Sequence, residues 1–262
     1  MVKRFRMVAG PNGSGKSSLV RRLRDDYRVN FYSFVNADDI FEQVLKTGAY
    51  SPKFPVSKDE LVRYAEDSTY GENVKGVFRG DAVRVEGDCV RFDRLAVNSY
   101  TMALFANFLQ DRFLDRGESF SQETVFSHPS KIAALKRAIE SGYRTYLYFI
   151  ATGNPTINVC RVANRYAQGG HNVPEDKIAS RYPRSLAQLK AAIPHLSRAY
   201  VFDNSGSEML FLGEYDRDSG WTFAMPADAM PAWFVQAIRT TDRSASTSSR
   251  RTRSMTSATA SC

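Results

Sequence analysis

The feature that most constrains the fold of this chain is a glycine-rich loop close to its N-terminus. The loop reads Gly10-Pro11-Asn12-Gly13-Ser14-Gly15-Lys16-Ser17 and matches the pattern G-x-x-x-x-G-K-[ST]. The apolar run at residues 5–9 predicts a buried strand before the loop, and residues 17–25 have the apolar spacing of a helix. Glycines in this context let backbone N–H groups turn inward around phosphate oxygens. We therefore expect the loop to bind the phosphates of a nucleoside triphosphate.

Each polar residue of the loop has an expected role in binding. Lys16 is predicted to reach the β- and γ-phosphates, and the Ser17 hydroxyl to ligate Mg²⁺. Ser18 follows them at the start of the helix and is predicted to bind the nucleotide as well. The helix that starts near Gly15 adds its positive end. The expected cofactors are ATP and Mg²⁺.

Apolar periodicity predicts an α/β fold of the P-loop NTPase type, with a mainly parallel sheet flanked by helices. Strands are expected at 5–9, 31–35, 119–125, 145–150, 199–202, 209–212 and 221–224. Helices are expected at 17–25, 36–47, 95–116, 156–168 and 175–193, the last one bent or broken near Pro183.

Two segments depart from this alternation of strands and helices. Residues 49–94 carry scattered Gly, Pro and charges, and 83–92 reads as a β-hairpin with a tight turn at Gly87-Asp88. We interpret 49–94 as an insertion into a kinase domain that spans 1–239. Residues 240–262 contain 13 Ser or Thr and no apolar stripe, which predicts a disordered tail.

The net charge of +8 is compatible with two kinds of partner. The tail contributes four arginines against one acid, a net +3, and the remaining +5 suits a protein that binds polyphosphates or nucleic acid. No run of about 18 apolar residues and no signal peptide is present, so we expect a cytoplasmic protein without a membrane span.

Two acids stand where α/β proteins build their sites, at the carboxyl ends of strands. Asp38 follows the second predicted strand and is the candidate general base, although it could instead cap a helix over 39–47. Glu123 ends the third predicted strand and could orient an acceptor molecule, although it could also be a solvated acid. The strand 146–152 ends without an acid and no guanine-reading N-K-x-D is present, which favours a kinase.

Four arginines lie on two helices joined by the loop 168–174. Arg161 and Arg165 are four residues apart on one face, and Arg181 and Arg184 follow the loop. Guanidinium groups stabilise the charge that develops during phosphoryl transfer, so residues 161–184 are predicted to form a lid over the nucleotide. His171, within this loop, could touch a phosphate or have no role.

Taken together, these motifs resemble the zeta-toxin family of P-loop kinases. The resemblance covers about residues 5–213, apart from the insertion. Its residues are Gly10–Ser17, Asn36-Ala37-Asp38-Asp39-Ile40, Glu123-Thr124, Arg161-Val162-Ala163-Asn164-Arg165, Gly169-Gly170-His171-Asn172-Val173-Pro174, Arg181-Tyr182, Arg184-Ser185-Leu186 and Phe202-Asp203-Asn204-Ser205. The second half of this series is similar to the branch of zeta-like proteins labelled as predicted ABC-type ATPases.

The resemblance implies an ATP-dependent kinase that phosphorylates a hydroxyl of a small molecule. In the founding toxins the acceptor is UDP-N-acetylglucosamine, and a small antitoxin protein blocks the ATP site. By position, Asp38 matches the catalytic aspartate and Glu123 the acid that holds the acceptor, with Thr124 and His171 beside it. The four arginines match the phosphate clamp. The acceptor stays open between nucleotide sugars and nucleotides, because the insertion follows the strand that carries the base.

Two other functions remain as alternatives. A P-loop protein acting on nucleic acid would use the basic charge, and a degenerate module would bind nucleotide without turnover. The intact Lys16, Ser17 and Asp38 disfavour the degenerate module.

Overall fold

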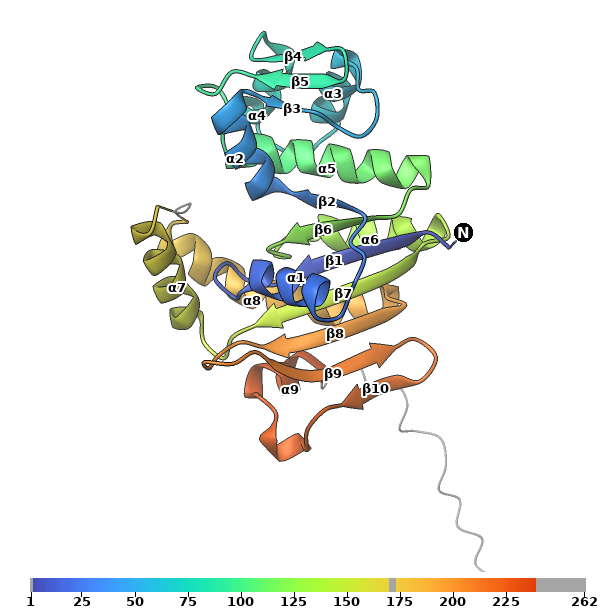
Figure 1. The fold of residues 1–262 in the computed structure, drawn as a ribbon, viewed down its shortest axis with the longest axis vertical. Helices are drawn as coiled ribbons and strands as arrows, with labels where there is room; N and C mark the ends of the chain where they lie inside the picture. Colours follow the sequence, from blue (N-terminus) through green and yellow to red (C-terminus); the bar gives the residue numbers. More distant parts are fainter. Residues whose placement is uncertain (1, 170–172, 239–262) are drawn as a thin grey trace, which may run out of the picture.

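The computed structural model describes residues 2–169 and 173–238 of the chain. Its central sheet is formed by β1 (Arg4–Ala9), β2 (Ser33–Asn36), β6 (Phe120–Thr124), β7 (Arg144–Ala151), β8 (Arg198–Asp203), β9 (Leu210–Asp216) and β10 (Gly220–Phe223). The strand order is β10-β9-β8-β7-β1-β6-β2 (Figure 1). Pairing is parallel from β2 to β8 and antiparallel for β9 and β10. This arrangement confirms the predicted fold class.

The strand before the glycine loop is the centre of the fold. β1 lies between β6 and β7, so both of its edges are hydrogen-bonded. Phe5 and Met7 face the larger hydrophobic core and Val8 faces the smaller one, all with no exposed surface. A strand buried on both faces is characteristic of parallel sheets, and it holds the following loop rigidly at the carboxyl edge of the sheet.

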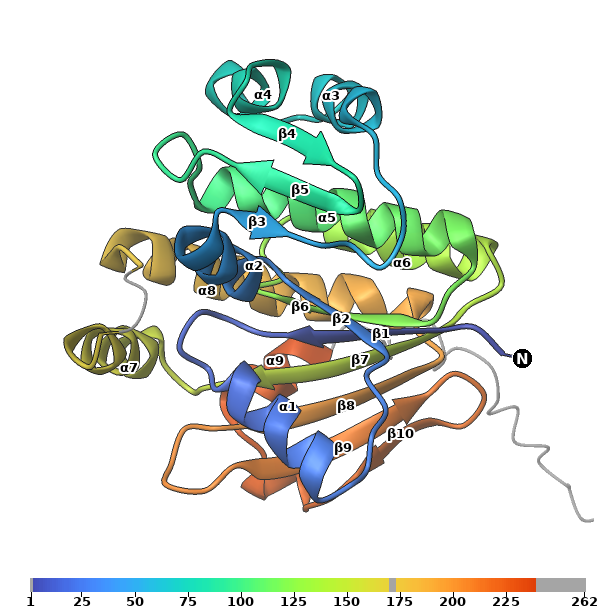
Figure 2. The same ribbon diagram turned by 45° about the horizontal axis from the view of Figure 1, so that its top comes forward.

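Helices cover the two faces of the sheet unequally. α1 (Lys16–Asp25) packs on one face, while α6 (Ser130–Glu140), α8 (Glu175–Ala192) and α9 (Ala232–Ile238) cover the other (Figures 1 and 2). α5 (Ser99–Arg116) continues this second layer. Two further helices lie at the edge where the parallel strands end. They are α2 (Ala37–Thr47), which begins there, and α7 (Pro155–Ala167). None of the helices in 2–169 and 173–238 is long and apolar enough to cross a membrane.

The region predicted as an insertion contains more structure than a hairpin. It holds β3 (Ala49–Tyr50), α3 (Lys58–Glu66), α4 (Glu72–Arg79), β4 (Val83–Glu86) and β5 (Cys89–Phe92). The predicted hairpin pairs Val83 with Phe92, and β3 adds a third strand. Neither α3, which begins with a capping box, nor α4 was predicted, because each spans fewer than ten residues.

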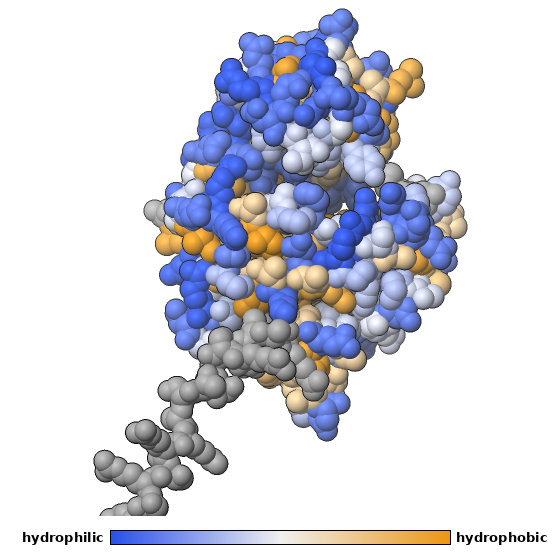
Figure 3. Space-filling view, turned by 180° about the vertical axis from the view of Figure 1, so that it is seen from behind, coloured by the Kyte–Doolittle hydropathy of each residue, from blue (hydrophilic) through white to orange (hydrophobic). Residues whose placement is uncertain are grey.

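The insertion shares one hydrophobic core with the sheet. The ring of Phe105 in α5 packs against the rings of Phe92 in β5 and Tyr50 in β3. The ring centroids are 5.2 Å and 5.6 Å apart, respectively. Figure 3 shows the molecule from the side opposite α1, with the insertion at the top. The outer surface of the insertion is mainly hydrophilic in this view. The insertion therefore buries its apolar residues against α5 and presents polar residues to solvent.

Of the two alternatives predicted near Pro183, a bend or a break, the break was wrong, because α8 is one helix with Pro183 inside it. Pro183 and Ala179, whose carbonyl loses its helical partner there, both lie on the exposed face of α8. Water can therefore satisfy the carbonyl, which lowers the cost of the proline. The tail at 240–262 lies outside the described residues.

Candidate functional site

The glycine loop has a backbone that only glycine permits at three positions. Gly10, Gly13 and Gly15 all have positive φ angles. A Cβ at Gly13 would lie 2.5 Å from the carbonyl oxygen of Asn158, and one at Gly15 would lie 2.4 Å from Nδ2 of Asn204. No side chain caps α1, which begins directly after Gly15. The N–H groups at the start of α1 are thus left for an anion.

Two asparagines outside the loop fix its shape. Asn158 of α7 donates from Nδ2 to the Asn12 carbonyl at 2.5 Å and contacts the hydroxyl of Thr152. Asn204, after β8, donates from Nδ2 to the Ser14 carbonyl at 2.8 Å. These supporting residues were not predicted as site residues. Asn204 falls within a motif that resembles the zeta-toxin family, whereas no sequence signal marks Asn158.

Lys16 is buried and its ammonium donates to the Pro11 carbonyl at 3.1 Å. Burial lowers the pKa of Lys16, while the negative charges of Glu123 and Asp38 oppose this shift and Arg165 reinforces it. The Ser14 hydroxyl is also buried, with no hydrogen-bond partner among the described residues. A buried cation and an unpaired hydroxyl beside open helical N–H groups form a site that fits the phosphates of ATP.

Asp38 does not cap α2, so this alternative interpretation was wrong. α2 begins at Ala37, and its cap is Asn36, whose Oδ1 accepts the backbone N–H of Asp38 at 3.1 Å. The cap lies two residues before Asp38 because β2 runs directly into the helix. The exposed Asp38 carboxylate is therefore not needed for capping and its charge acts on Lys16 and Glu123.

Glu123 lies at the end of β6, the strand paired with β1 on the side of β2. Burial raises the pKa of Glu123, and Asp39 and Asp38 add to the shift. Lys16 opposes it, and the Ser17 hydroxyl lies close enough to favour the charged carboxylate. Ser17 and Glu123 thus offer the hydroxyl and carboxylate oxygens that Mg²⁺ prefers. No acidic residue ends β7, but Glu123 supplies one near the end of the neighbouring part of the sheet, on β6.

The turn after Glu123 is strained and held from two sides. Phe126 is fully buried with φ at 60°, a conformation that costs a bulky residue about 1–2 kcal/mol. The Thr124 hydroxyl accepts the N–H of Phe126 at 3.2 Å, and the Ser185 hydroxyl donates to the Val125 carbonyl at 2.9 Å. These bonds fix the backbone beside the site, and they commit part of the hydrogen-bonding capacity of Thr124.

The four arginines are not gathered at one point. Arg181 reaches Oδ1 of Asn12 at 3.5 Å, and the charge of Arg165 acts on Lys16. Arg161 instead donates to the carbonyls of Asn204 at 2.6 Å and Gly206 at 3.2 Å. Arg184 bonds the Ser180 carbonyl of its own helix at 2.9 Å. The lid over 161–184 stays a prediction, and His171 lies outside the described residues.

The sheet order, the glycine loop and the Lys16–Ser17 pair together define a protein of the P-loop nucleotide-binding class. The family model described as zeta toxin matches residues 95–216. This match confirms the predicted resemblance to the zeta-toxin family. The matched segment contains Glu123 and the four arginines, while Lys16 and Asp38 lie before it.

Similar proteins were found among both curated sequences and solved structures. An uncharacterized protein of Haemophilus influenzae is 35% identical over 63 residues, which are 24% of this chain and 45% of that protein. The crystal structure of AvrRxo1-ORF1:-ORF2 with ATP matches with a TM-score of 0.53 at 13% identity, covering 85% of this chain and 61% of that one. The PezAT chromosomal toxin–antitoxin system of Streptococcus pneumoniae matches with a TM-score of 0.47 at 14% identity, covering 89% and 75%.

Both likenesses cover only part of the known proteins. The chain spans less than half the length of the curated relative and about three fifths of the first of these solved structures. At 13% identity the structural likeness establishes the fold, not the substrate.

Proposed function

We propose that this protein transfers the γ-phosphate of ATP to a hydroxyl of a small molecule, as a zeta-type toxin kinase. The observation that supports this best is the juxtaposition of three charged groups at one edge of the sheet, since Glu123 pairs in register with Val8, before the loop that carries Lys16, and with Asn36, before Asp38. The Asp38 and Glu123 charges both act on Lys16, and Asp38 also acts on Glu123. A phosphate-binding lysine, a base and a metal-holding acid are the parts that phosphoryl transfer requires.

The roles follow from the chemistry of each side chain. Lys16 binds the β- and γ-phosphates. The guanidinium groups of Arg165 and Arg181 interact with the same phosphate end of the nucleotide. Ser17 and Glu123 would hold Mg²⁺, which would neutralise phosphate charge when bound. Asp38 accepts the proton of the acceptor hydroxyl as its oxygen bonds to the γ-phosphorus, and the bond from that phosphorus to ADP breaks.

UDP-N-acetylglucosamine, or another nucleotide sugar or nucleotide, is the proposed acceptor. Support comes from the zeta-toxin family match alone. The experiment is incubation with γ-labelled ATP and a panel of nucleotide sugars and nucleotides, followed by separation of labelled products.

Asp38→Asn should reduce transfer about 10²- to 10⁴-fold without weakening ATP binding, because it removes only the proton acceptor. Glu42→Gln is the matched control, since Glu42 is an exposed acid on the same helix and pairs with Lys46. Glu42→Gln should keep transfer within a fewfold of wild type. Equal losses in both variants, or a panel in which no acceptor is labelled, would contradict the proposal.

Glu123→Gln distinguishes two roles of this acid. If Glu123 holds Mg²⁺ with Ser17, the variant needs more Mg²⁺ for ATP binding while the KM for the acceptor is unchanged. If Glu123 holds the acceptor, as the family resemblance implies, the KM for the acceptor rises and the Mg²⁺ dependence stays the same. Direct titration of Mg²⁺ with ATP present separates these outcomes without measuring turnover.

We also propose a protein partner that blocks the ATP site. Support comes from the family name and from the two-protein complex formed by the structural relative AvrRxo1-ORF1. Co-expression with the product of a neighbouring small reading frame should yield a complex that no longer binds ATP. Purified complex with undiminished ATP binding would refute this partner role.

A further inference from the structure

A polar cavity lies away from the glycine loop, between α3, α5 and α6. Its volume is about 210 Å³, far above the roughly 10–15 Å³ that one water molecule needs. The polar residues that line it are Tyr64, Asn107, Gln110, Asp111, Ser130, Lys131 and Arg137. Tyr64 belongs to the insertion, so the insertion supplies one wall of the cavity.

Lys131 is a cation in this cavity without a contacting carboxylate among the described residues. Its ammonium donates to Oδ1 of Asn107 at 2.7 Å, its one hydrogen bond within that part of the chain. The Asn107 amide is oriented by donating from Nδ2 to the Tyr70 hydroxyl at 3.4 Å. The residue keeps some exposed surface, yet burial around the ammonium lowers its pKa to about 8. An ammonium has three donors, so two remain available to a ligand.

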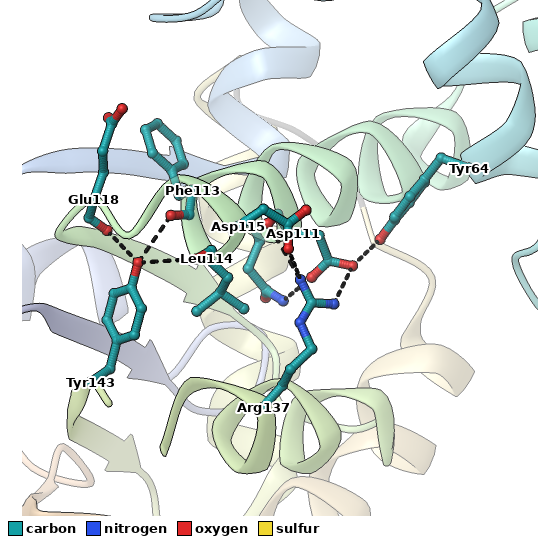
Figure 4. A network of polar contacts seen from close by, with 9 residues as sticks. Tyr64, Asp111, Phe113, Leu114, Asp115, Glu118, Arg137 and Tyr143 are labelled. Carbon is teal, nitrogen blue, oxygen red and sulfur yellow. Dashed lines mark hydrogen bonds and ion pairs between the residues drawn. The ribbon is translucent and has the colours of Figure 1, made fainter. Parts of the chain in front are cut away.

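The nearest acid is already committed to other partners. The Asp111 carboxylate pairs with Arg137 at 3.1 Å and accepts the Tyr64 hydroxyl at 2.9 Å, while Arg137 also reaches Asp115 at 3.4 Å. Figure 4 shows Tyr64 from the insertion and Arg137 from α6 converging on Asp111 of α5. Asp111 acts on Lys131 only through space. This network contains two carboxylates and one guanidinium, and neither carboxylate contacts the Lys131 ammonium.

Gln110 provides a second unsatisfied group at the same cavity. The residue is 4% exposed, and its Nε2 donates to Asp111 at 3.1 Å. Its Oε1 is buried without a hydrogen-bond partner among the described residues. Such an orphaned acceptor costs stability unless a donor reaches it. The cavity is therefore lined by a cation with N–H donors and by a residue whose buried side-chain oxygen lacks a donor.

We propose that this cavity is a binding site for a small anion that also carries hydroxyl groups, such as a sugar phosphate. Lys131 binds the anionic oxygens, and Gln110 accepts a hydrogen bond from a hydroxyl. The site is independent of the phosphate loop and of the proposed kinase reaction. It gives the insertion a function, since α3 closes the wall that the sheet and its helices leave open.

The test is calorimetric titration of the full chain with inorganic phosphate and with glucose 6-phosphate at pH 7. Phosphate should bind at two places, one lost in Lys16→Met and the other lost in Lys131→Met. Lys136→Met is the matched control, because Lys136 is an exposed lysine on the same helix, and it should leave both intact. Glucose 6-phosphate should bind the second place more tightly than phosphate does.

A substitution that keeps Lys131 separates anion binding from structure. Asn107→Asp places a carboxylate at the oxygen that Lys131 already contacts, so it should weaken anion binding at least tenfold without unfolding the protein. Unchanged phosphate binding in Lys131→Met or Asn107→Asp, or loss of all binding in Lys16→Met, would overturn the proposal. Equal affinities for phosphate and glucose 6-phosphate would overturn the role of Gln110.

Discussion

Two lysines, one buried and one half-buried, occupy comparable places in two regions of this protein. Lys16 opens the helix after β1 and is held by the Pro11 carbonyl at 3.1 Å, while Lys131 lies in the first turn of α6, after β6, and is held by Asn107 at 2.7 Å. Burial lowers the pKa of both, and carboxylates act on both through space. Each ammonium has N–H donors that could bind an anion.

The difference between the two regions lies in the backbone. The loop before Lys16 leaves the N–H groups of α1 uncapped, which suits several phosphates in a row. At the start of α6, Nδ1 of His128 accepts the N–H of Ser130 at 3.2 Å. The carbonyl oxygen of His128 accepts the N–H of Lys131 at 3.1 Å. The second region therefore offers side chains only, which suits one anionic group and a hydroxyl.

The comparison assumes that both regions belong to one cooperative fold. Phe92→Ala, in the insertion, should cost about 3–5 kcal/mol in the free energy of unfolding, because Phe92 is 5% exposed and packs on Phe105. Urea denaturation followed by fluorescence and by circular dichroism should show a single shifted transition. Leu95→Ala is the control, since Leu95 is 97% exposed and should change stability by less than about 0.5 kcal/mol. A separate transition at lower urea concentration would show that the two regions do not unfold as one cooperative unit.

Exchange of either lysine for methionine should separate the two regions functionally. Lys16→Met should weaken ATP binding about ten- to a hundredfold, because a hydrogen bond to a charged group contributes about 1.5–3 kcal/mol. Lys131→Met should change ATP affinity less than about twofold. Titration with fluorescent ATP measures both, and similar losses in the two variants would mean that the regions act as one site.

The helix that carries Asp38 begins with an asparagine cap, unlike α1, which has no side-chain cap. Asn36→Ala should destabilise the protein by about 1 kcal/mol, because Oδ1 of Asn36 accepts the N–H of Asp38. Asn36→Ser should retain most of the stability, since serine also caps helices. Thermal denaturation compares the variants, and an Asn36→Ala protein as stable as wild type would contradict the assigned cap.

The lowered pKa of Lys131 predicts a stability change with pH in the absence of anions. Between pH 7 and 9 the unfolded chain keeps this proton while the folded protein loses it, so stability rises with pH. The gain should be about 1 kcal/mol, measured as the difference between wild type and Lys131→Met in urea denaturation. Asp111, Arg137 and Tyr64 surround the group in both proteins, so their contributions cancel. A difference that is flat or falls with pH would show that the ammonium is hydrated.

The parts of the fold that could be predicted are those that local patterns specify. The parallel strands, α1 and the 83–92 hairpin follow from apolar spacing and turn residues, because each is short-range in sequence. α3 and α4 were missed because they are short and stabilised by packing on α5. The alternative that Asp38 caps α2 was wrong, because the boundary between β2 and the helix has no turn to mark it.

By itself, the sequence determined the phosphate loop, since eight consecutive residues form the cradle and their backbone supplies its donors. It also supplied Asp38 and Glu123, each at a strand end. Only the tertiary structure set Glu123 beside Ser17, because pairing of β6 with β1 unites residues about a hundred positions apart. Likewise, only packing placed Lys131 against Asn107 and Tyr64 near Asp111, since burial and long-range contact leave no local pattern.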